Sequence, residues 1–206
     1  MTHSRLDLSF AIGRVSRYTQ TPHESHSKAA KIILRYIRGT IQFGIHYSIG
    51  GTPLLVGFTN SDWADDLDDR KSIVVYVFSL GSGPVTWACK KQQALALSLV
   101  EAEYRTTVNA SQEALWLQQI LLEFGFEQQQ TTPLWWDNQS AIKLSKYLVL
   151  HQRSKHIELH MHFIINIIHD SVIEVLYFPT DDQVPDIFTK CLTEAKFSKL
   201  QSMLGV

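Results

Sequence analysis

Apolar positions near the start of the chain follow a helical spacing. Leu8, Ile12 and Val15 recur every three or four residues, and the same spacing continues through the segment that follows. The pattern predicts helices across residues 5–42, with Gly39 as a stop for the last of them.

The spacing changes after 48–53, SIGGTP, which is typical of a turn or linker. Residues 54–64, 72–80 and 83–92 are rich in β-branched and aromatic side chains and predict three strands. A glycine turn at 81–83 joins the last two. We therefore expect a three-stranded meander.

A long helical pattern follows at residues 97–126. Its expected apolar stripe consists of Tyr104, Val108, Leu115 and Leu122.

The rest of the chain predicts two more strands and three helices. They are strands 134–136 and 171–179, helices 139–146 and 158–170, and a last helix that starts near Asp182. The order βββ-α-β-α-α-β-α is typical of an α/β fold with a mixed sheet flanked by helices. In such a sheet the first strand commonly lies centrally, beside the strand after the first helix. Ligands then collect at the carboxyl ends of those strands.

Composition limits the class of protein. A chain of 206 residues with 45% hydrophobic residues and five tryptophans can bury the core of one substantial domain, and we expect the tryptophans in that core. A net charge of -1 gives no overall basic field, although a local basic face is compatible with it. The apolar runs are too short for a secretory signal or a membrane span. We therefore expect an intracellular protein, cytoplasmic or nuclear, that is not secreted and has no membrane partner.

Three acidic residues could meet at the expected edge of the sheet. Asp137 ends a strand, Glu103 lies in the first half of the long helix and Asp186 lies early in the last one, with Asp62 as a fourth candidate. Clustered carboxylates raise one another's pKa unless cations lie among them. Mg²⁺ and Mn²⁺ prefer such oxygen ligands, and a pair of these ions about 3.5–4 Å apart can direct attack on a phosphodiester. Solvated surface acids are the alternative, as is an N-cap role for Asp137 in helix 139–146.

Several stretches together resemble the ribonuclease H domain of Ty1/copia-type retrotransposon polyproteins. They are NSDWADDLDDRKSIVVYVFSLGSGPVTWACKKQ, ALSLVEAEYRT, EALWLQQILLEFG, WWDNQSAIKLSK, HQRSKHIELHMHFI and FPTDDQVPDIFTKCL. The leading SRLDLSFAIGRVSRYTQTPHESHSKAAKIILRYIRGT resembles the end of the reverse transcriptase in the same polyproteins. The resemblance implies a helical transcriptase remnant at 1–47, a linker at 48–53 and a ribonuclease H-like domain at 54–206. It also implies the reverse transcriptase portion as a partner.

The family implies hydrolysis of the RNA strand of RNA–DNA hybrids with two Mg²⁺ or Mn²⁺ ions. By position, its metal-binding acids are Glu103 in EAEY, Asp137 in WWDNQSA and Asp186 in DQVPDIFTK. The fourth differs, because the family's Y-S-D-A-D-W-A reads FTNSDWA here and Asn60 stands where the bridging Asp is expected. A neutral amide predicts weaker metal binding and a loss of a few kcal/mol, or about a thousandfold in rate. Asp62 matches the family's second Asp and could replace the missing ligand only through a shift in strand register.

Other positions also depart from the family pattern. They are Leu6, Val75, Val100, Pro185 and Cys191. With Asn60, these changes indicate a decaying copy of the element.

Basic residues could contact the phosphates of a hybrid. Arg153, Lys155 and His156 match a basic motif of the family. Further candidates lie in the meander: Arg70, Lys71, Lys90 and Lys91. A solvated loop with His156 packed structurally is the alternative. His156 and His160 lie four residues apart, but no cysteine joins them, so zinc is not expected.

Three functions are compatible with the sequence. The first is a ribonuclease H domain with impaired chemistry. The second is a module that binds hybrids by shape without cutting them. The third is an inert fragment whose 5–42 segment exposes an apolar face.

Overall fold

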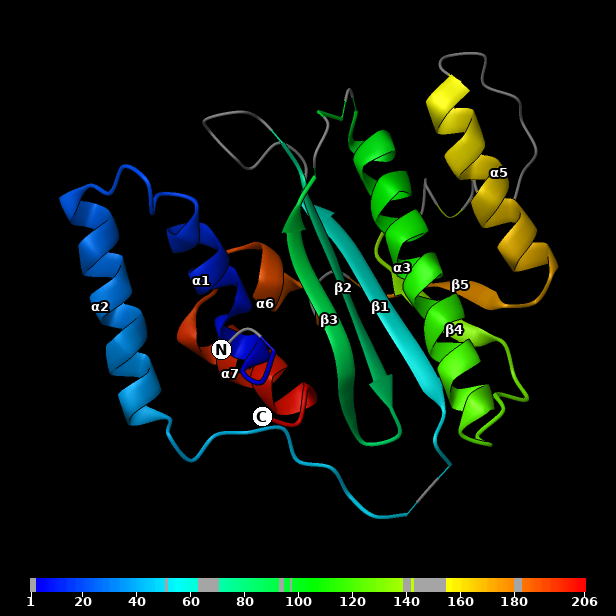
Figure 1. The fold of residues 1–206 in the computed structure, drawn as a ribbon, viewed down its shortest axis with the longest axis horizontal. Coiled ribbons are helices and arrows are strands. Elements are labelled where there is room, and N and C mark those ends of the chain that lie inside the picture. Colours follow the sequence, from blue (N-terminus) through cyan, green and yellow to red (C-terminus); the bar gives the residue numbers. More distant parts are fainter. Residues whose placement is uncertain are drawn as a thin grey trace.

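The computed structural model shows a mixed sheet with helices on both faces (Figure 1). The structure describes residues 3–50, 52–62, 71–92, 95–96, 98–138, 142, 155–179 and 183–206, with the backbone alone at 62, 100 and 155–158. The predicted helix at 139–146 therefore lies almost wholly outside the described residues.

Five strands form the sheet in the order β3-β2-β1-β4-β5. Their bounds are β1 Leu55–Asp62, β2 Ile73–Leu80, β3 Gly83–Lys91, β4 Thr132–Trp136 and β5 Ile173–Tyr177. The first three strands are antiparallel, whereas β4 runs parallel to both β1 and β5. The predicted mixed sheet is confirmed, and so is the central place of its first strand.

Two helices cover one face of the sheet: α3, Leu99–Glu123, and α5, Lys155–His169 (Figure 1). Ser98 caps α3 by accepting a hydrogen bond from the backbone N–H of Glu101 at 3.1 Å. The core on this face contains residues from all three elements, including Phe78, Tyr104 and Ile164.

The predicted stripe of α3 is correct only in its first half. Tyr104 and Val108 are buried, but Leu115 is 37% exposed and Leu122 is 49% exposed. The buried positions of the second half are Ala110, Ala114, Leu117 and Leu121. This helix has apolar residues on more than one side, so spacing alone does not identify the side that meets the sheet.

The tryptophans are not all in the core. Trp136 is 1% exposed, whereas Trp116, on the outer side of α3, is 56% exposed, so the expectation was wrong for Trp116. Trp87 and Trp135 are half-buried, and Trp63 lies outside the described residues.

The other face is covered by short helices from both ends of the chain (Figure 1). They are η1 Leu6–Leu8, α1 Ser9–Ser16, α6 Asp186–Thr189 and α7 Glu194–Met203. The prediction of one last helix near Asp182 was wrong. The chain becomes extended at Lys190, and Thr193 caps a new helix by accepting from the N–H of Lys196.

The N-terminal segment contacts the C-terminal helix directly. The carboxylate of Asp7 accepts hydrogen bonds from Tyr36 at 2.8 Å and from Gln201 of α7 at 3.3 Å. Tyr36 belongs to α2, Glu24–Gly39, which ends at Gly39 as predicted. Packing therefore crosses the expected boundary at residues 48–53.

No helix in the described parts of the chain is long and apolar enough to cross a membrane.

Candidate active site

The sheet brings the ends of β1 and β4 together. The two strands run parallel, and Thr59 pairs with Trp136. Asn60 and Asp137 are the next residues along their strands, so they occupy neighbouring positions at the same edge. This is the carboxyl edge at which ligands collect in such sheets.

Asn60 contacts Asp186 at this edge. The Asn60 side-chain nitrogen donates to Oδ1 of Asp186 at 3.2 Å, and both side chains are buried. Pro185 stands directly before α6 and places Asp186 in its first turn, where a proline is well tolerated.

Glu103 reaches the same cluster from the first turns of α3. It is 4% exposed, and burial raises the pKa of its carboxyl to about 7. Hydrogen bonds from the Asn138 and Trp136 side chains lower this pKa, and the charge of Asp137 raises it. Its Oε2 has no hydrogen-bond partner among the described residues.

Asp137 interacts electrostatically with both Glu103 and Asp186. Burial raises the pKa of Asp137, the charge of Asp186 raises it further, and the charge of Lys190 lowers it. Glu103, Asp137 and Asp186 thus form one acidic cluster with Asn60 beside it.

The register of β1 does not place Asp62 at the position of Asn60. Pairing with β2 runs without interruption from Leu55 opposite Leu80 to Asp62 opposite Ile73. The strand therefore shows no shift that would move Asp62 to the position of Asn60. The side chain of Asp62 lies outside the described residues.

The acidic residues of the cluster differ in whether their oxygens are available to bind an ion. Glu103 has a free buried oxygen, whereas Asp186 already accepts hydrogen bonds from Asn60 and from two lysines. Across the residues with described side chains, no three His, Cys, Asp or Glu groups are arranged to hold a metal ion. The donor chemistry fits one hard divalent ion at Glu103 and Asp137, and does not fit a second ion at Asp186.

Comparison with known proteins shows what the chain as a whole is similar to. The chain is 37% identical, over all 206 residues, to the retrovirus-related Pol polyprotein from transposon TNT 1-94 of Nicotiana tabacum, of which it covers 15%. It is also 37% identical over its full length to the polyprotein from transposon RE2 of Arabidopsis thaliana, of which it covers 14%. Over its whole length the chain is related to one segment of the retrovirus-related Pol polyproteins of transposons.

The solved structures support the fold of this Pol segment. The structure of LC11-RNase H1, isolated from compost by a metagenomic approach, superposes with a TM-score of 0.51 at 10% identity. The match covers 66% of this chain and 92% of that protein. The segment therefore has a ribonuclease H-like fold. No protein-family model matches the chain.

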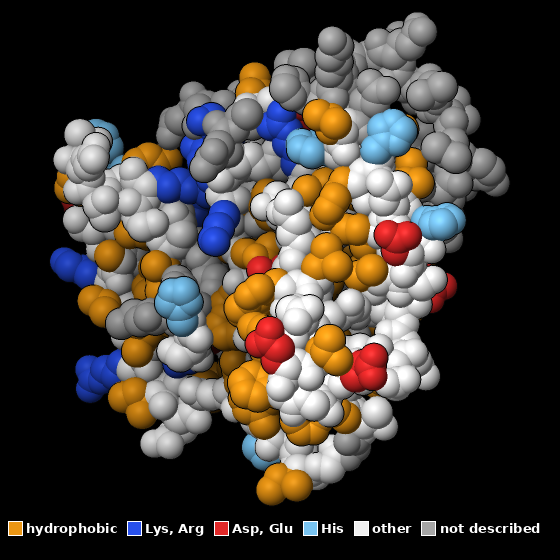
Figure 2. Space-filling model, turned by 45° about the vertical axis from the view of Figure 1, so that its right-hand side comes forward, with side chains coloured by type: hydrophobic (Ala, Val, Ile, Leu, Met, Phe, Trp, Pro, Cys, Tyr) orange, Lys and Arg blue, Asp and Glu red, His pale blue; other side chains and the backbone are white. Residues whose placement is uncertain are grey.

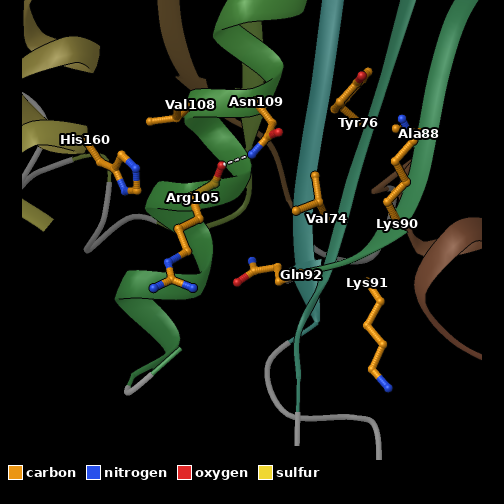
Figure 3. Close-up of a pocket in the computed structure, with 10 residues that line it drawn as sticks. All are labelled: Val74, Tyr76, Ala88, Lys90, Lys91, Gln92, Arg105, Val108, Asn109 and His160. Atoms are coloured by element: carbon orange, nitrogen blue, oxygen red, sulfur yellow. Dashed lines mark hydrogen bonds between the residues drawn. The ribbon is translucent and has the colours of Figure 1, made fainter. Parts of the chain in front are cut away.

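A groove of about 440 Å³ in the Pol segment is lined by residues of β2, β3, α3 and α5 (Figure 3). Its polar and charged lining residues are Tyr76, Lys90, Lys91, Gln92, Arg105, Asn109 and His160. Arg105 pairs with Glu101 at 2.7 Å on the same helix. A group of Lys, Arg and His side chains lies in the upper part of the face shown in Figure 2.

Two of the residues predicted to contact phosphates, Lys90 and Lys91, line this groove, and their contact with a hybrid stays a prediction. Arg105 and His160 also line it and were not among the predicted phosphate contacts, because helical spacing alone does not place them there. Lys71 is partly buried and does not line the groove. The remaining predicted cations have side chains outside the described residues: Arg70, Arg153, Lys155 and His156.

Proposed function

We propose that this Pol segment is a ribonuclease H-type domain that acts on the RNA strand of RNA–DNA hybrids, and that Asn60 impairs its chemistry. The observation that carries the proposal is the cluster of Glu103, Asp137 and Asp186 around Asn60 at the carboxyl edge of β1 and β4. The ribonuclease H-like fold supports it.

Mg²⁺ or Mn²⁺ is the cofactor that such oxygen ligands favour. Glu103 and Asp137 would hold it, and a bound divalent ion would activate water and stabilise the charge that develops on the phosphate. Burial of Glu103 excludes water from the ligand oxygens, which strengthens their interaction with any cation.

Asn60 weakens the site in two ways. It carries no charge, so the cluster has three carboxylates instead of four. Its N–H group also points at Asp186, and this hydrogen bond occupies an oxygen that an ion would need. A unit charge at about 4 Å is worth roughly 4 kcal/mol at an effective dielectric of about 20, so a loss of about a thousandfold in rate is reasonable.

The test is cleavage of a labelled RNA–DNA hybrid in Mg²⁺. The unmodified protein is expected to cut no faster than background, and Asn60→Asp is expected to restore Mg²⁺-dependent cutting. Glu103→Gln in the Asn60→Asp background should abolish it again. Asn166→Asp, at an exposed position of α5, adds the same charge away from the site and should have no effect. Robust cutting by the unmodified protein would show that Asn60 is not limiting.

A second function is supported by the groove that contains Lys90, Lys91 and His160. These side chains could bind hybrid phosphates without any cutting, as expected of a module that recognises the shape of a hybrid. Such binding would persist in chelator.

The remaining assignments also belong to this proposal. Residues 1–47 would be the end of a reverse transcriptase, with the transcriptase portion of a longer polyprotein as partner. The chain covers about one-seventh of the tobacco and Arabidopsis Pol polyproteins, so the activities of the whole polyprotein are not attributed to it.

A further inference from the structure

The carboxylate of Asp186 is surrounded by hydrogen-bond donors. Lys196 contacts its Oδ2 at 2.8 Å, Lys190 contacts the same oxygen at 2.9 Å, and Asn60 donates to Oδ1 at 3.2 Å. The Asp186 side chain is fully buried. A buried carboxylate with no counter-charge is strongly unfavourable, and here two ammonium groups supply that charge.

The two lysines are held differently. Lys190 lies four residues after Asp186 and its side chain is 45% exposed, so it is a local partner at the end of a short helix. Lys196 comes from α7, and its side chain is only 29% exposed. Tertiary structure fixes its position, because Thr193 caps α7 and Leu200 is fully buried further along the same helix.

The lysines also change the charge of the cluster. Glu103, Asp137 and Asp186 are three acids, and Lys190 and Lys196 are two cations directly at one of them. Oδ2 of Asp186 is therefore in contact with two ammonium groups, and Oδ1 accepts from Asn60.

We infer that Lys196 is a built-in counter-ion that takes the cation position at Asp186 and lowers the affinity of the site for divalent metal. The inference rests on the proposed metal site but not on hybrid cleavage. Lys196 is a positioning residue that supplies a counter-charge to the buried Asp186 carboxylate and fixes its position when no metal is bound. A divalent ion must displace its ammonium before it can reach Asp186.

The experiment is Mn²⁺ titration by calorimetry, together with thermal unfolding in EDTA and in Mn²⁺, for the unmodified protein and Lys196→Ala. Lys196→Ala should melt at a lower temperature in EDTA and regain that loss in Mn²⁺. Its Mn²⁺ affinity should rise about tenfold or more, because one of the two positive charges at Asp186 leaves the site and only Lys190 still contacts Oδ2. Lys28→Ala is the matched control, because Lys28 pairs with Glu24 on the surface of α2 and should change neither measurement.

The outcomes separate a counter-ion from a merely structural lysine. A structural role would lower the melting temperature without raising metal affinity, and that result would overturn the inference. If Lys196→Ala does not fold in EDTA, its folding on addition of Mn²⁺ would support the counter-ion role. In that case Lys196→Gln is titrated as well, and no gain in its Mn²⁺ affinity would contradict that role. No nucleic acid is used, so a gain in metal affinity stands even if Asn60→Asp fails to cut hybrid.

Discussion

The side-chain amide of Asn60 donates to the carboxylate of Asp186 at 3.2 Å, although 126 positions separate the two residues in sequence. The contact joins the central strand β1 to the first turn of α6 at the edge where Asp137 leaves β4. A residue that would repel Asp186 if it were an aspartate instead binds it. The amide of Asn60 therefore stabilises this edge of the sheet in the absence of metal.

This relationship predicts a metal-dependent change in stability for Asn60→Asp. In EDTA the new carboxylate replaces a hydrogen bond with a like-charge contact in a buried place, so the variant should lose about 1–3 kcal/mol of unfolding free energy. Mg²⁺ should restore much of that loss, because a cation can lie between the carboxylates. Urea unfolding with and without Mg²⁺ measures both effects. Equal stability of the two proteins in EDTA would contradict the contact.

Glu103 predicts a pH dependence of stability in metal-free protein. Its pKa rises from an ordinary 4.5 to about 7 on folding, so the folded state favours the protonated form. The contribution of Glu103 to the unfolding free energy is complete below pH 4.5 and is lost as the pH rises through 7. The loss lowers the unfolding free energy by on the order of 2–3 kcal/mol. Unfolding free energies at pH 5 and pH 8 should show this fall.

Glu103→Gln should remove that pH-dependent loss and make the metal-free protein more stable than the unmodified one at pH 8. Glu123→Gln, at an exposed position of the same helix, is the control and should leave the fall unchanged. A fall of the same size in Glu103→Gln would assign it to another group.

The fold was largely predictable because the spacing of apolar residues indicates which positions are buried. The strands β1, β2 and β3 were predicted by continuous or alternating apolar runs, and β2 is buried along most of its length. The second half of α3 was mispredicted, since Leu115 and Leu122 share a helical face with Tyr104 yet reach solvent.

The site was less accessible to pattern reasoning. Nothing local in FTNSDWA or DQVPDIFTK indicates that Asn60 meets Asp186, and only the resemblance to a family suggested it. Nothing in the sequence indicated that Lys196 contacts Asp186, because a lysine on a short amphipathic helix usually lies on the solvent-exposed face. Its role depends on where α7 packs, which is a property of the tertiary structure.

The groove predicts how hybrid binding responds to salt. If Lys90 and Lys91 contact phosphates, each substitution by Ala should weaken binding to hybrids of any sequence and reduce the slope of log affinity against log salt by about 1. Anisotropy of a labelled hybrid across a KCl series, in EDTA, measures this without cutting. Lys28→Ala, in an exposed ion pair on α2, should leave the slope unchanged. If the slope of log affinity against log salt were near zero in the unmodified protein, contacts between the groove and hybrid phosphates would be excluded.

The N-terminal segment predicts a stability effect that a loosely attached remnant would not have. Leu6 is fully buried in the core that includes Val75, Phe188 and Leu200, so Leu6→Ala should cost about 2–4 kcal/mol of unfolding free energy. Leu34→Ala is the matched control, because Leu34 is 60% exposed on α2 and should cost little. Urea unfolding followed by tryptophan fluorescence compares them. For the same reason, deletion of residues 1–47 should destabilise the sheet, because it uncovers the core under α6 and α7. If Leu6→Ala left stability unchanged, the segment would be an appendage, and its deletion would be harmless.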